Sequence, residues 1–291
     1  MTGTLFFGGG TKMKYVVTAF TDEAADDLKN QIAACKRNGI SHIEIRGVNG
    51  KNIGSVTPQE AREIKKLLDG EGIKISAIGS PYGKIGIADD FKPHLEAYKR
   101  TIEVAHVLEA NKIRIFSFYI PSGKTRSDFR HDVIERVGAF VKFSDGVLPC
   151  HENESGIYGE DAEHCLELAN AYGGKLKLIF DPANFIFCGV KSRPAYELLK
   201  EHIDYFHIKD CESGERKTVP AGFGDGEIKW ILKDFKPKEN VFLSVEPHLA
   251  SFTGLSALSK NEEKPLQFAY SSRDEAFDAA VAALKKIMKG L

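Results

Sequence analysis

Short apolar segments alternate with longer amphipathic segments along almost the whole chain. The short segments are rich in β-branched residues, which is typical of strands. The longer segments carry the capping residues and glycine stops of helices. In one of them, Thr57, Pro58 and Glu60 form an N-cap, a first-turn proline and an acidic first turn. This alternation predicts right-handed crossovers and a parallel sheet.

The alternation amounts to eight strand–helix units. The predicted strands are residues 14–20, 42–47, 73–79, 112–118, 146–152, 175–181, 204–210 and 240–246. The predicted helices are residues 23–37, with Asp22 as its cap, 57–68, 90–108, 127–143, 161–171, 194–201, 227–234 and 273–288. Eight such units predict an α/β fold closed into a (β/α)₈ TIM barrel. An open doubly wound sheet is the alternative, but the turn after the first strand, TAFTDEA, lacks the glycine-rich phosphate pattern of that fold.

The length of 291 residues suits one such barrel, so we expect residues 13–291 to form a single TIM-barrel domain. Residues 1–12 are expected to be a leader or disordered N-terminal segment. The net charge of -1 argues against a nucleic-acid partner, which needs clustered positive charge. No apolar run approaches the roughly 18 residues of a membrane span. Five cysteines without a CxxC pair predict reduced thiols and a cytoplasmic protein.

Four successive predicted strands end in a side chain that binds metals. The segments LPCHENE, LIFDPANF, YFHIKD and FLSVEPH place there Glu152, Asp181, His207 and Glu246. Taken singly, each residue has a commoner explanation as a helix cap, a core histidine or a solvated rim carboxylate. Catalytic groups of TIM barrels lie at the carboxyl ends of neighbouring strands, so we expect these four side chains to converge at the barrel mouth.

Three carboxylates and one imidazole form an oxygen-rich site with one nitrogen. Such a set suits one divalent metal ion, Mn²⁺ or Mg²⁺, with Co²⁺ or Zn²⁺ as alternatives. Without a cation the carboxylates would repel one another and raise each other's pKa. We therefore predict that the aspartate of LIFDPANF, Asp181, is a metal ligand.

At these strand ends the chain resembles the xylose isomerase-like TIM barrels, the sugar phosphate isomerase/epimerase superfamily. The segments HENE, FDPANF, FHIKD and SVEPH match its metal-binding strand ends in order and spacing. The resemblance covers nearly all of the chain from about Met13. It implies that Glu152, Asp181, His207 and Glu246 bind one divalent ion, commonly Mn²⁺. It does not specify the substrate, because the superfamily includes isomerases, epimerases, dehydratases, lyases and endonucleases.

Two departures from the superfamily pattern narrow the function. Keto-sugar 3-epimerases carry a histidine three residues after the metal-binding aspartate, where this chain has Asn184. The endonuclease IV branch needs extra histidines after the third, fourth and seventh strands, where SPYGK, FSFYI and GFGDGE have none. DNA repair is therefore not expected.

The chemistry that the resemblance implies is proton transfer next to a carbonyl. The metal would polarise a sugar carbonyl and its neighbouring hydroxyl and so stabilise an enediolate. Glu152 and Glu246 would approach from opposite sides and act as general base and acid. Lys209 shares the face of His207 and would stabilise the enolate oxygen or move a proton, with a salt bridge to a neighbouring carboxylate as the alternative.

Three further residues are predicted to bind the substrate. Asn184 would hydrogen-bond a hydroxyl, unless it only shapes the turn after Pro182. Arg46 would bind a carboxylate or phosphate together with Arg114. The alternative for the two arginines is an internal ion pair with an acidic residue of the first two units, Asp22, Glu23 or Glu44. Lys84, in the loop SPYGKIG, would reach a substrate oxygen or remain solvated.

These residues support a divalent-metal-dependent isomerase or epimerase acting on a keto-sugar or related polyol. A dehydratase or lyase acting on a keto-inositol or 3-keto sugar is the alternative, favoured by Asn184 and by Lys209 as a lone base. A non-catalytic sugar-binding barrel is the third possibility, which the intact ligand set disfavours. The long polar segment 247–272 is expected to be a lid, a subunit contact or a surface insertion, and a homo-oligomer is common on this fold.

Overall fold

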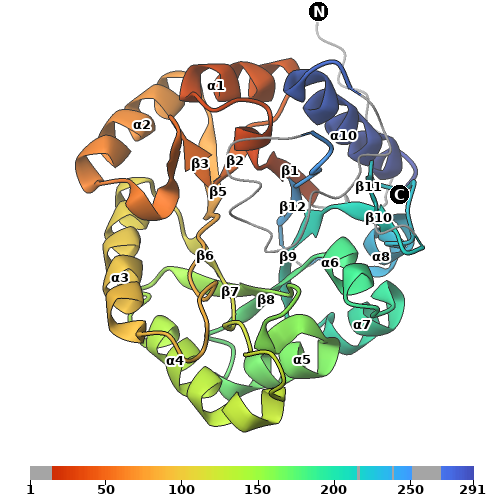
Figure 1. Ribbon diagram of the computed structural model, residues 1–291. Helices are drawn as coiled ribbons and strands as arrows, with labels where there is room; N and C mark the ends of the chain where they lie inside the picture. The colour runs from red at the N-terminus through yellow and green to blue at the C-terminus, as the bar shows by residue number, and fades with distance from the viewer. Residues whose placement is uncertain (1–14, 215–216, 238, 251–269) are drawn as a thin grey trace, which may run out of the picture.

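The computed structural model describes residues 15–214, 217–237, 239–250 and 270–291. They form a closed barrel of eight parallel strands inside a ring of helices (Figure 1). Around the barrel the strands follow the order β1, β2, β5, β6, β7, β8, β9 and β12, and β12 pairs with β1 to close it. The predicted TIM barrel is therefore confirmed.

Each barrel strand coincides with a predicted one. The strands are β1 (Tyr15–Ala19), β2 (His42–Ile45), β5 (Lys74–Ile78), β6 (Lys112–Ile115), β7 (Leu148–Glu152), β8 (Lys177–Phe180), β9 (Ile203–Ile208) and β12 (Val241–Val245). The helices that follow them are α1 (Leu28–Arg37), α2 (Pro58–Gly70), α3 (Phe91–Val107), α4 (Arg130–Lys142), α5 (Ala162–Ala171), α7 (Ser192–Leu199), α8 (Ile228–Asp234) and α10 (Arg273–Met288).

Shorter helical turns and strands lie in the loops between these units. They are η1 (Thr21–Glu23), β3 (Gly47–Val48), β4 (Lys51–Asn52), η2 (Ile53–Ser55), η3 (Arg126–Phe129), η4 (Tyr158–Glu160), α6 (Pro182–Phe187), β10 (Asp210–Glu212) and β11 (Lys217–Val219). The strands β3 and β4 form one antiparallel hairpin and β10 and β11 another. The turn η3 lies at the start of the helix predicted for residues 127–143. The other short elements were not predicted as separate elements, because each is only a few residues long.

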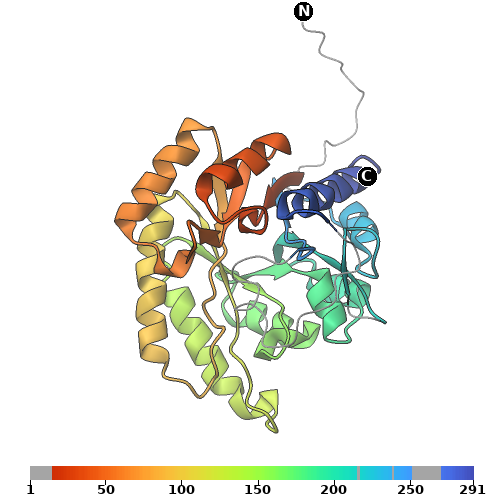
Figure 2. The same cartoon turned by 45° about the horizontal axis from the view of Figure 1, so that its top comes forward.

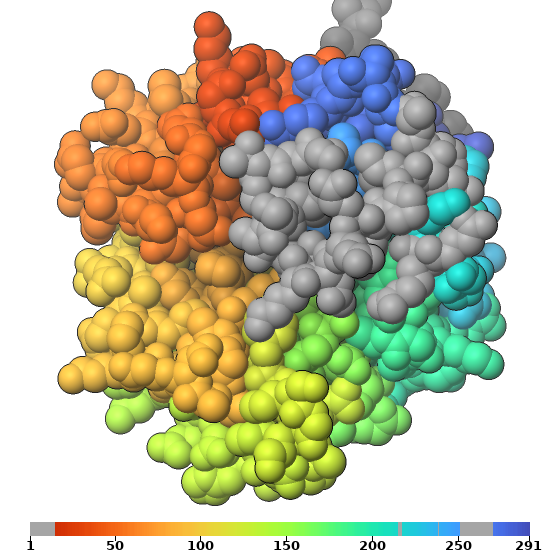
Figure 3. Space-filling model, in the orientation of Figure 1, coloured from red at the N-terminus to blue at the C-terminus, as the bar shows by residue number. Residues whose placement is uncertain are grey.

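The barrel separates an apolar layer from a polar interior. Outward-facing Ile43 and Ile113 are buried in one core cluster with Ile64 of α2 and Ile102 of α3. Burying such a side chain is worth about 2 kcal/mol. In space-filling form, helices α2, α3 and α4 make a continuous outer wall (Figure 3). The inward-facing residues near the carboxyl ends of the strands are instead charged, and this end of the barrel holds the candidate site.

The first helix begins later than predicted. Thr21–Glu23 form the 3-10 turn η1, and α1 begins at Leu28, where the Asp27 side chain accepts a hydrogen bond from the Asn30 N–H. The prediction that Asp22 caps this helix is therefore wrong. Its carboxylate binds Arg46 instead, so a tertiary ion pair replaces the local cap. The capping box of α2, by contrast, forms between Thr57 and Glu60 as predicted.

The last helix returns the chain to the first unit. Helix α10 contacts β12 and the turn η1, and in the tilted view it lies beside the N-terminal strand (Figure 2). Residues 1–12 and most of segment 247–272 lie outside the described residues, so the predictions for them stay predictions. Within the described chain, no helix has the length and apolar character needed to cross a membrane. None of the five cysteines, all of which lie in the described part of the chain, forms a disulfide bond.

Candidate metal centre

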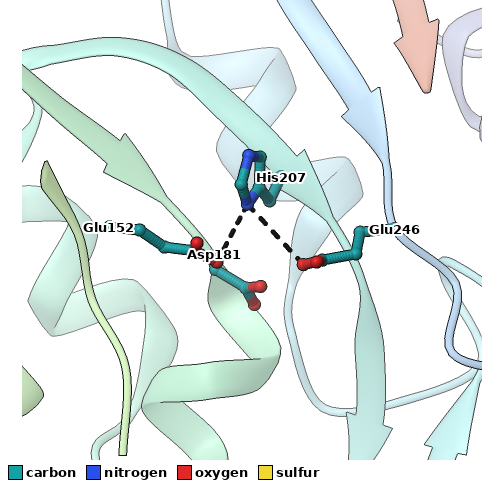
Figure 4. Close-up of side chains that lie close together, drawn as sticks. All are labelled: Glu152, Asp181, His207 and Glu246. Carbon is teal, nitrogen blue, oxygen red and sulfur yellow. Dashed lines mark hydrogen bonds and ion pairs between the residues drawn. The ribbon is translucent and has the colours of Figure 1, made fainter. Parts of the chain in front are cut away.

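The four predicted ligands meet at the carboxyl end of the barrel. Glu152 ends β7, Asp181 follows β8, His207 lies in β9 and Glu246 follows β12. One ligand atom from each lies within 4.8 Å of the others, and all four residues are buried. Figure 4 shows Glu152 and Glu246 entering from opposite sides, with His207 and Asp181 between them. The structure thus brings together the residues that the sequence placed on successive strands.

Asp181 is both a helix cap and a member of this cluster. It follows β8 and precedes Pro182, the first residue of α6. Its Oδ1 accepts a hydrogen bond from the Asn184 N–H at 2.9 Å. Its Oδ2 is buried and forms an ion pair with the Lys209 Nζ at 2.9 Å. The angles of this contact do not make it a hydrogen bond, so the oxygen has no hydrogen-bond donor among the described residues. One oxygen therefore shapes the turn, while the other faces the centre.

The His207 ring is oriented by carboxylates on both of its nitrogens. Its Nδ1 lies 2.9 Å from the Glu152 Oε1 and 3.6 Å from the Glu246 Oε2. Its Nε2 lies 3.2 Å from both oxygens of Glu44, which also accepts a hydrogen bond from the Tyr205 hydroxyl. A carboxylate behind a ligating histidine fixes the ring and raises its basicity. This role of Glu44 was not predicted, although the inward parity of Glu44 in HIEIRG was a usable signal.

Two buried arginines bind the ligand glutamates. The Arg114 Nη1 donates to the Glu152 Oε2 at 3.0 Å, and the Arg46 Nη1 donates to the Glu246 Oε1 at 2.8 Å. Arg46 also binds both acidic residues of η1, Asp22 and Glu23, which agrees with the ion-pair alternative for this arginine. Arg114 also forms an internal ion pair, but its partners are Glu152 and Glu246 rather than Asp22, Glu23 or Glu44.

Lys209 and Asn184 lie inside the cluster. The Lys209 Nζ is 2.9 Å from the Asp181 Oδ2 and 3.2 Å from the Glu246 Oε2. The Asn184 Nδ2 donates to the Glu152 Oε1 at 3.2 Å and to the Asn153 carbonyl at 2.9 Å. Both residues therefore touch candidate metal ligands, and Asn184 does more than form a turn.

Lys84 lies outside the cluster. Its Nζ is 2.9 Å from the Glu154 Oε2 and 4.5 Å from the centre of the Phe116 ring. Its side chain is only 8% exposed, so the solvated alternative is wrong. The predicted contacts of Lys84 and Arg46 with substrate remain predictions.

Two buried carboxyl groups at this end of the barrel have raised pKa values. Burial, together with Glu152 and Glu246, raises the pKa of Asp181 to about 7 in spite of Lys209. Burial also raises the pKa of Glu23 to about 8. A carboxyl group held neutral in this way indicates that its charged form lacks compensation. A divalent cation among the carboxylates would supply it.

Other groups in the centre stay charged. Burial works to raise the pKa of Glu152, but His207 and Arg114 outweigh it and lower that pKa to about 2. Burial likewise opposes the protonated form of His207, but Glu152 and Glu44 raise its pKa to about 10. In the absence of a cation, the His207 ring thus takes over part of the missing positive charge.

The residues fit a divalent metal ion. The donor set is three carboxylates and one imidazole, with a buried aspartate oxygen that accepts no hydrogen bond. Such oxygen-rich sites bind Mn²⁺ or Mg²⁺, and imidazole also suits Zn²⁺. The identity of the ion is not specified by these donors.

The glycine-rich loop GFGDGE holds a carboxylate of the chain itself. The N–H groups of Gly222, Gly224 and Gly226 donate to the Asp210 side chain at 2.8, 3.2 and 2.9 Å, and the Cys211 N–H donates at 2.9 Å. Backbone N–H groups of a glycine-rich loop can bind a phosphate, but these N–H groups bind a side chain of the chain itself. Trp230 of α8 packs edge-on against Tyr196 of α7.

The family of the chain follows from comparison with known proteins. The family model of the xylose isomerase-like TIM barrel matches residues 32–287, and the chain belongs to this family. No curated protein matches it significantly in sequence.

Several solved structures share the fold. A D-psicose 3-epimerase from Clostridium cellulolyticum H10, solved with D-tagatose, is 17% identical with a TM-score of 0.70 over 95% of this chain and 99% of its own. The IolI protein with a bound zinc atom is 16% identical with a TM-score of 0.70, covering 94% and 98%. The probable 3-DHS dehydratase AsbF from Bacillus anthracis is 17% identical with a TM-score of 0.69, covering 94% and 99%. At these identities the likeness concerns the fold alone.

Proposed function

We propose that the protein is a divalent-metal-dependent sugar isomerase or epimerase that transfers a proton next to the carbonyl of a keto-sugar or related polyol. The observation that carries this proposal is the convergence of Glu152, Asp181, His207 and Glu246 on one buried point, with Lys209 beside them. A buried excess of carboxylates costs stability, and a metal-dependent reaction accounts for it.

The two glutamates are placed to move a proton. When bound, the ion would act as a Lewis acid toward a carbonyl and its neighbouring hydroxyl. Glu152 and Glu246 reach the centre from opposite sides, so one can remove a proton from the carbon next to the carbonyl and the other can return it (Figure 4). Return to the opposite face inverts that carbon, and return to the adjacent carbon isomerises the sugar.

Lys209 and Asn184 would support this step. The Lys209 ammonium stands between Asp181 and Glu246, where it can stabilise the enediolate oxygen or carry a proton. Asn184 fixes Glu152 through its Nδ2 and is proposed to contact a substrate hydroxyl. Arg46 and Lys84 are the remaining proposed substrate contacts.

The ion is proposed to be Mn²⁺, because three carboxylates and one imidazole match its preference. The relatives with solved structures include epimerases of free sugars and a protein with bound zinc, so a free sugar substrate is proposed and Zn²⁺ remains an alternative. A cytoplasmic location and a homo-oligomer complete the proposal.

A metal-dependent dehydratase or lyase is the second candidate. Asn184 stands where keto-sugar 3-epimerases have a histidine, and the structure commits its amide nitrogen to Glu152 and to a backbone carbonyl. Lys209 is then the one amine in contact with the described ligands, and elimination from the same enolate needs a single acid–base group. A protein with this fold, AsbF, is described as a probable dehydratase.

Deuterium exchange tests the proposal. The Mn²⁺-loaded protein is incubated in D₂O with a panel of ketoses, 3-keto-glucosides and 2-keto-inositol, and the products are followed by NMR. We expect solvent deuterium at the carbon next to the carbonyl of one substrate, which Glu246→Gln abolishes. Glu103→Gln, at an exposed position of α3, is the matched control. An unsaturated product would identify the lyase, and metal binding without exchange on any member would favour the non-catalytic barrel.

A further inference from the structure

We propose that Arg46 and Arg114 are positioning residues of the metal centre, which bind one oxygen of each ligand glutamate and leave the other for the ion. Arg46 also acts as a fixed cation in a neighbouring acidic cluster and so limits the site to one ion. This inference rests on the proposed metal centre and concerns how the chain builds it.

Arg46 is bound on three sides by carboxylates. Its Nη1 donates to the Glu246 Oε1 at 2.8 Å, its Nε to the Asp22 Oδ2 at 2.8 Å and its Nη2 to the Glu23 Oε1 at 3.1 Å. The side chain is 3% exposed, and its guanidinium lies 4.3 Å from the centre of the Phe20 ring. These contacts allow the planar Arg46 guanidinium only one position, and the guanidinium therefore fixes the Glu246 carboxylate.

Arg114 holds the opposite glutamate in the same way. Its Nη1 donates to the Glu152 Oε2 at 3.0 Å, and its Nη2 and Nε donate to the carbonyls of Gly79 and Ser80, both at 3.2 Å. Its guanidinium lies 4.9 Å from the centre of the Phe20 ring. The two arginines thus share one aromatic support between the two glutamates.

These contacts divide the oxygens of each glutamate. The Oε2 of Glu152 binds Arg114, while its Oε1 faces the Nδ1 of His207 at 2.9 Å. The Oε1 of Glu246 binds Arg46, while its Oε2 faces the Nδ1 of His207 at 3.6 Å and Lys209. Each glutamate therefore offers one oxygen to an ion. If each glutamate bound an ion through one oxygen, coordination positions would be left for the carbonyl and hydroxyl of a substrate.

A second acidic cluster adjoins the centre. Glu23, Glu246 and His248 also bring ligand atoms within 4.8 Å of one another. The His248 Nε2 lies 3.5 Å from the Glu23 Oε1 and 3.6 Å from the Glu246 Oε1. Those are the same two oxygens that accept hydrogen bonds from Arg46. A second ion in this cluster would meet the guanidinium, so Arg46 supplies the positive charge there instead.

Charge-preserving variants test the positioning role. Arg46→Lys and Arg114→Lys keep the charge and lose the planar fork, and Mn²⁺ affinity is measured by calorimetric titration. We expect Mn²⁺ to bind about 10-fold more weakly or worse in each, as is common for groups that orient metal ligands. Arg37→Lys makes the same change at an exposed ion pair with Asp278 and should leave the affinity unchanged. Wild-type affinity in both buried variants would overturn the proposal.

The number of Mn²⁺ ions bound by Arg46→Ala tests whether Arg46 limits the site to one ion. Removing the guanidinium leaves space and uncompensated carboxylates, so we expect two Mn²⁺ ions per chain where the wild type binds one. One ion per chain in this variant would refute the charge-substitution role. If Arg46→Ala does not fold by circular dichroism, Arg46→Gln, which also removes the charge but keeps a longer polar side chain, is titrated in its place. A wild type that binds no Mn²⁺ would refute the proposed metal centre itself, which is a different result from unaltered affinity in the variants.

Discussion

Two aspartates at the ends of neighbouring strands have opposite surroundings. Asp181 follows β8 and Asp210 follows β9, and both are almost completely buried. The Asp210 carboxylate accepts four backbone N–H donors, three from the glycine loop and one from Cys211. The Asp181 carboxylate accepts one, from Asn184, and its other oxygen faces Lys209 and three further metal-binding side chains.

The comparison separates a structural carboxylate from a functional one. Buried polar atoms are normally satisfied by hydrogen bonds, and Asp210 follows this rule within its own loop. Asp181 departs from it. Burial raises the pKa of both carboxyl groups, to about 7 for Asp181, but at Asp210 four backbone hydrogen bonds oppose the rise. An incompletely satisfied carboxylate beside other carboxylates is suited to a cation, whereas a satisfied one holds the fold.

The largest predicted effect is on metal binding by Asp181→Asn. The change removes a charged ligand oxygen, so we expect Mn²⁺ affinity to fall by more than about 100-fold, beyond the loss typical of residues that only orient ligands. The metal-free protein should keep or gain stability, because the ionised form of Asp181 is disfavoured by burial. Calorimetric titration and thermal melting measure the two effects. Loss of stability without loss of affinity would assign Asp181 a purely structural role.

The opposite pattern, a loss of stability without a loss of metal affinity, is expected for Asp210→Asn. The amide presents an NH₂ group to backbone donors that need an acceptor, so the free energy of unfolding should fall by about 3 kcal/mol. Mn²⁺ affinity should not change. Urea denaturation gives the stability, and Asp225→Asn, at an exposed carboxylate that accepts from Ser213, is the control. An Asp210→Asn variant that loses the metal but keeps its stability would contradict the structural role assigned to Asp210.

The stability of the metal-free protein is predicted to fall as pH rises from 6 to 8.5. The folded-state pKa values of Asp181 and Glu23 are raised to about 7 and about 8, so the folded state holds these protons more tightly than the unfolded chain. The raised pKa of His207, about 10, acts in the same direction above its ordinary value. Mn²⁺ should reverse the trend, because deprotonated ligands bind it better.

Thermal melting at both pH values, with chelator and with Mn²⁺, measures this effect. Equal melting temperatures at pH 6 and 8.5 in the presence of chelator would show that the carboxylates are compensated without an ion.

A smaller effect is predicted for Glu44→Gln. The Glu44 carboxylate faces the Nε2 of His207 and makes the ring a better ligand. We expect about 10-fold weaker Mn²⁺ binding, at the lower end of the range for such partners. Glu103→Gln serves as the exposed control, and unchanged affinity in Glu44→Gln would remove Glu44 from the site.

The smallest effect on metal binding is predicted for Lys84→Met. The lysine pairs with Glu154 outside the ligand cluster, so Mn²⁺ affinity should not change. Because the pair is largely buried, removal of the lysine should lower the free energy of unfolding by about 3 kcal/mol. Once a substrate is known, the proposed contact predicts a higher KM with little change in kcat. An altered Mn²⁺ affinity would place Lys84 closer to the centre than the structure does.

The sequence predicted those features that repeat or that depend on strand parity. The apolar residues of the eight strands are buried on the outer face of the barrel. Inward-facing residues at the carboxyl ends of neighbouring strands converge at the barrel mouth, so Glu152 and His207 could be placed together. The capping box of Thr57 and Glu60 is local and was predictable for the same reason.

What the sequence did not predict depends on distant partners. Asp22 looks like a helix cap, but its partner, Arg46, comes from another strand–helix unit. The glycine pattern of GFGDGE is similar to that of a phosphate-binding loop. The pattern alone does not reveal that its N–H groups donate to the Asp210 carboxylate. Glu44 was recognised only as a possible ion-pair partner, since nothing local shows that His207 stands across the barrel.

The most direct test of the account is the metal content of purified protein, by plasma mass spectrometry after Mn²⁺ loading and removal of free ion. Wild type, Asp181→Asn and Asp210→Asn are compared. The account predicts one divalent ion per chain in the wild type and in folded Asp210→Asn, and none in Asp181→Asn. No ion in the wild type, or equal loss in the two variants, would contradict the claim that the four strand ends form a metal centre.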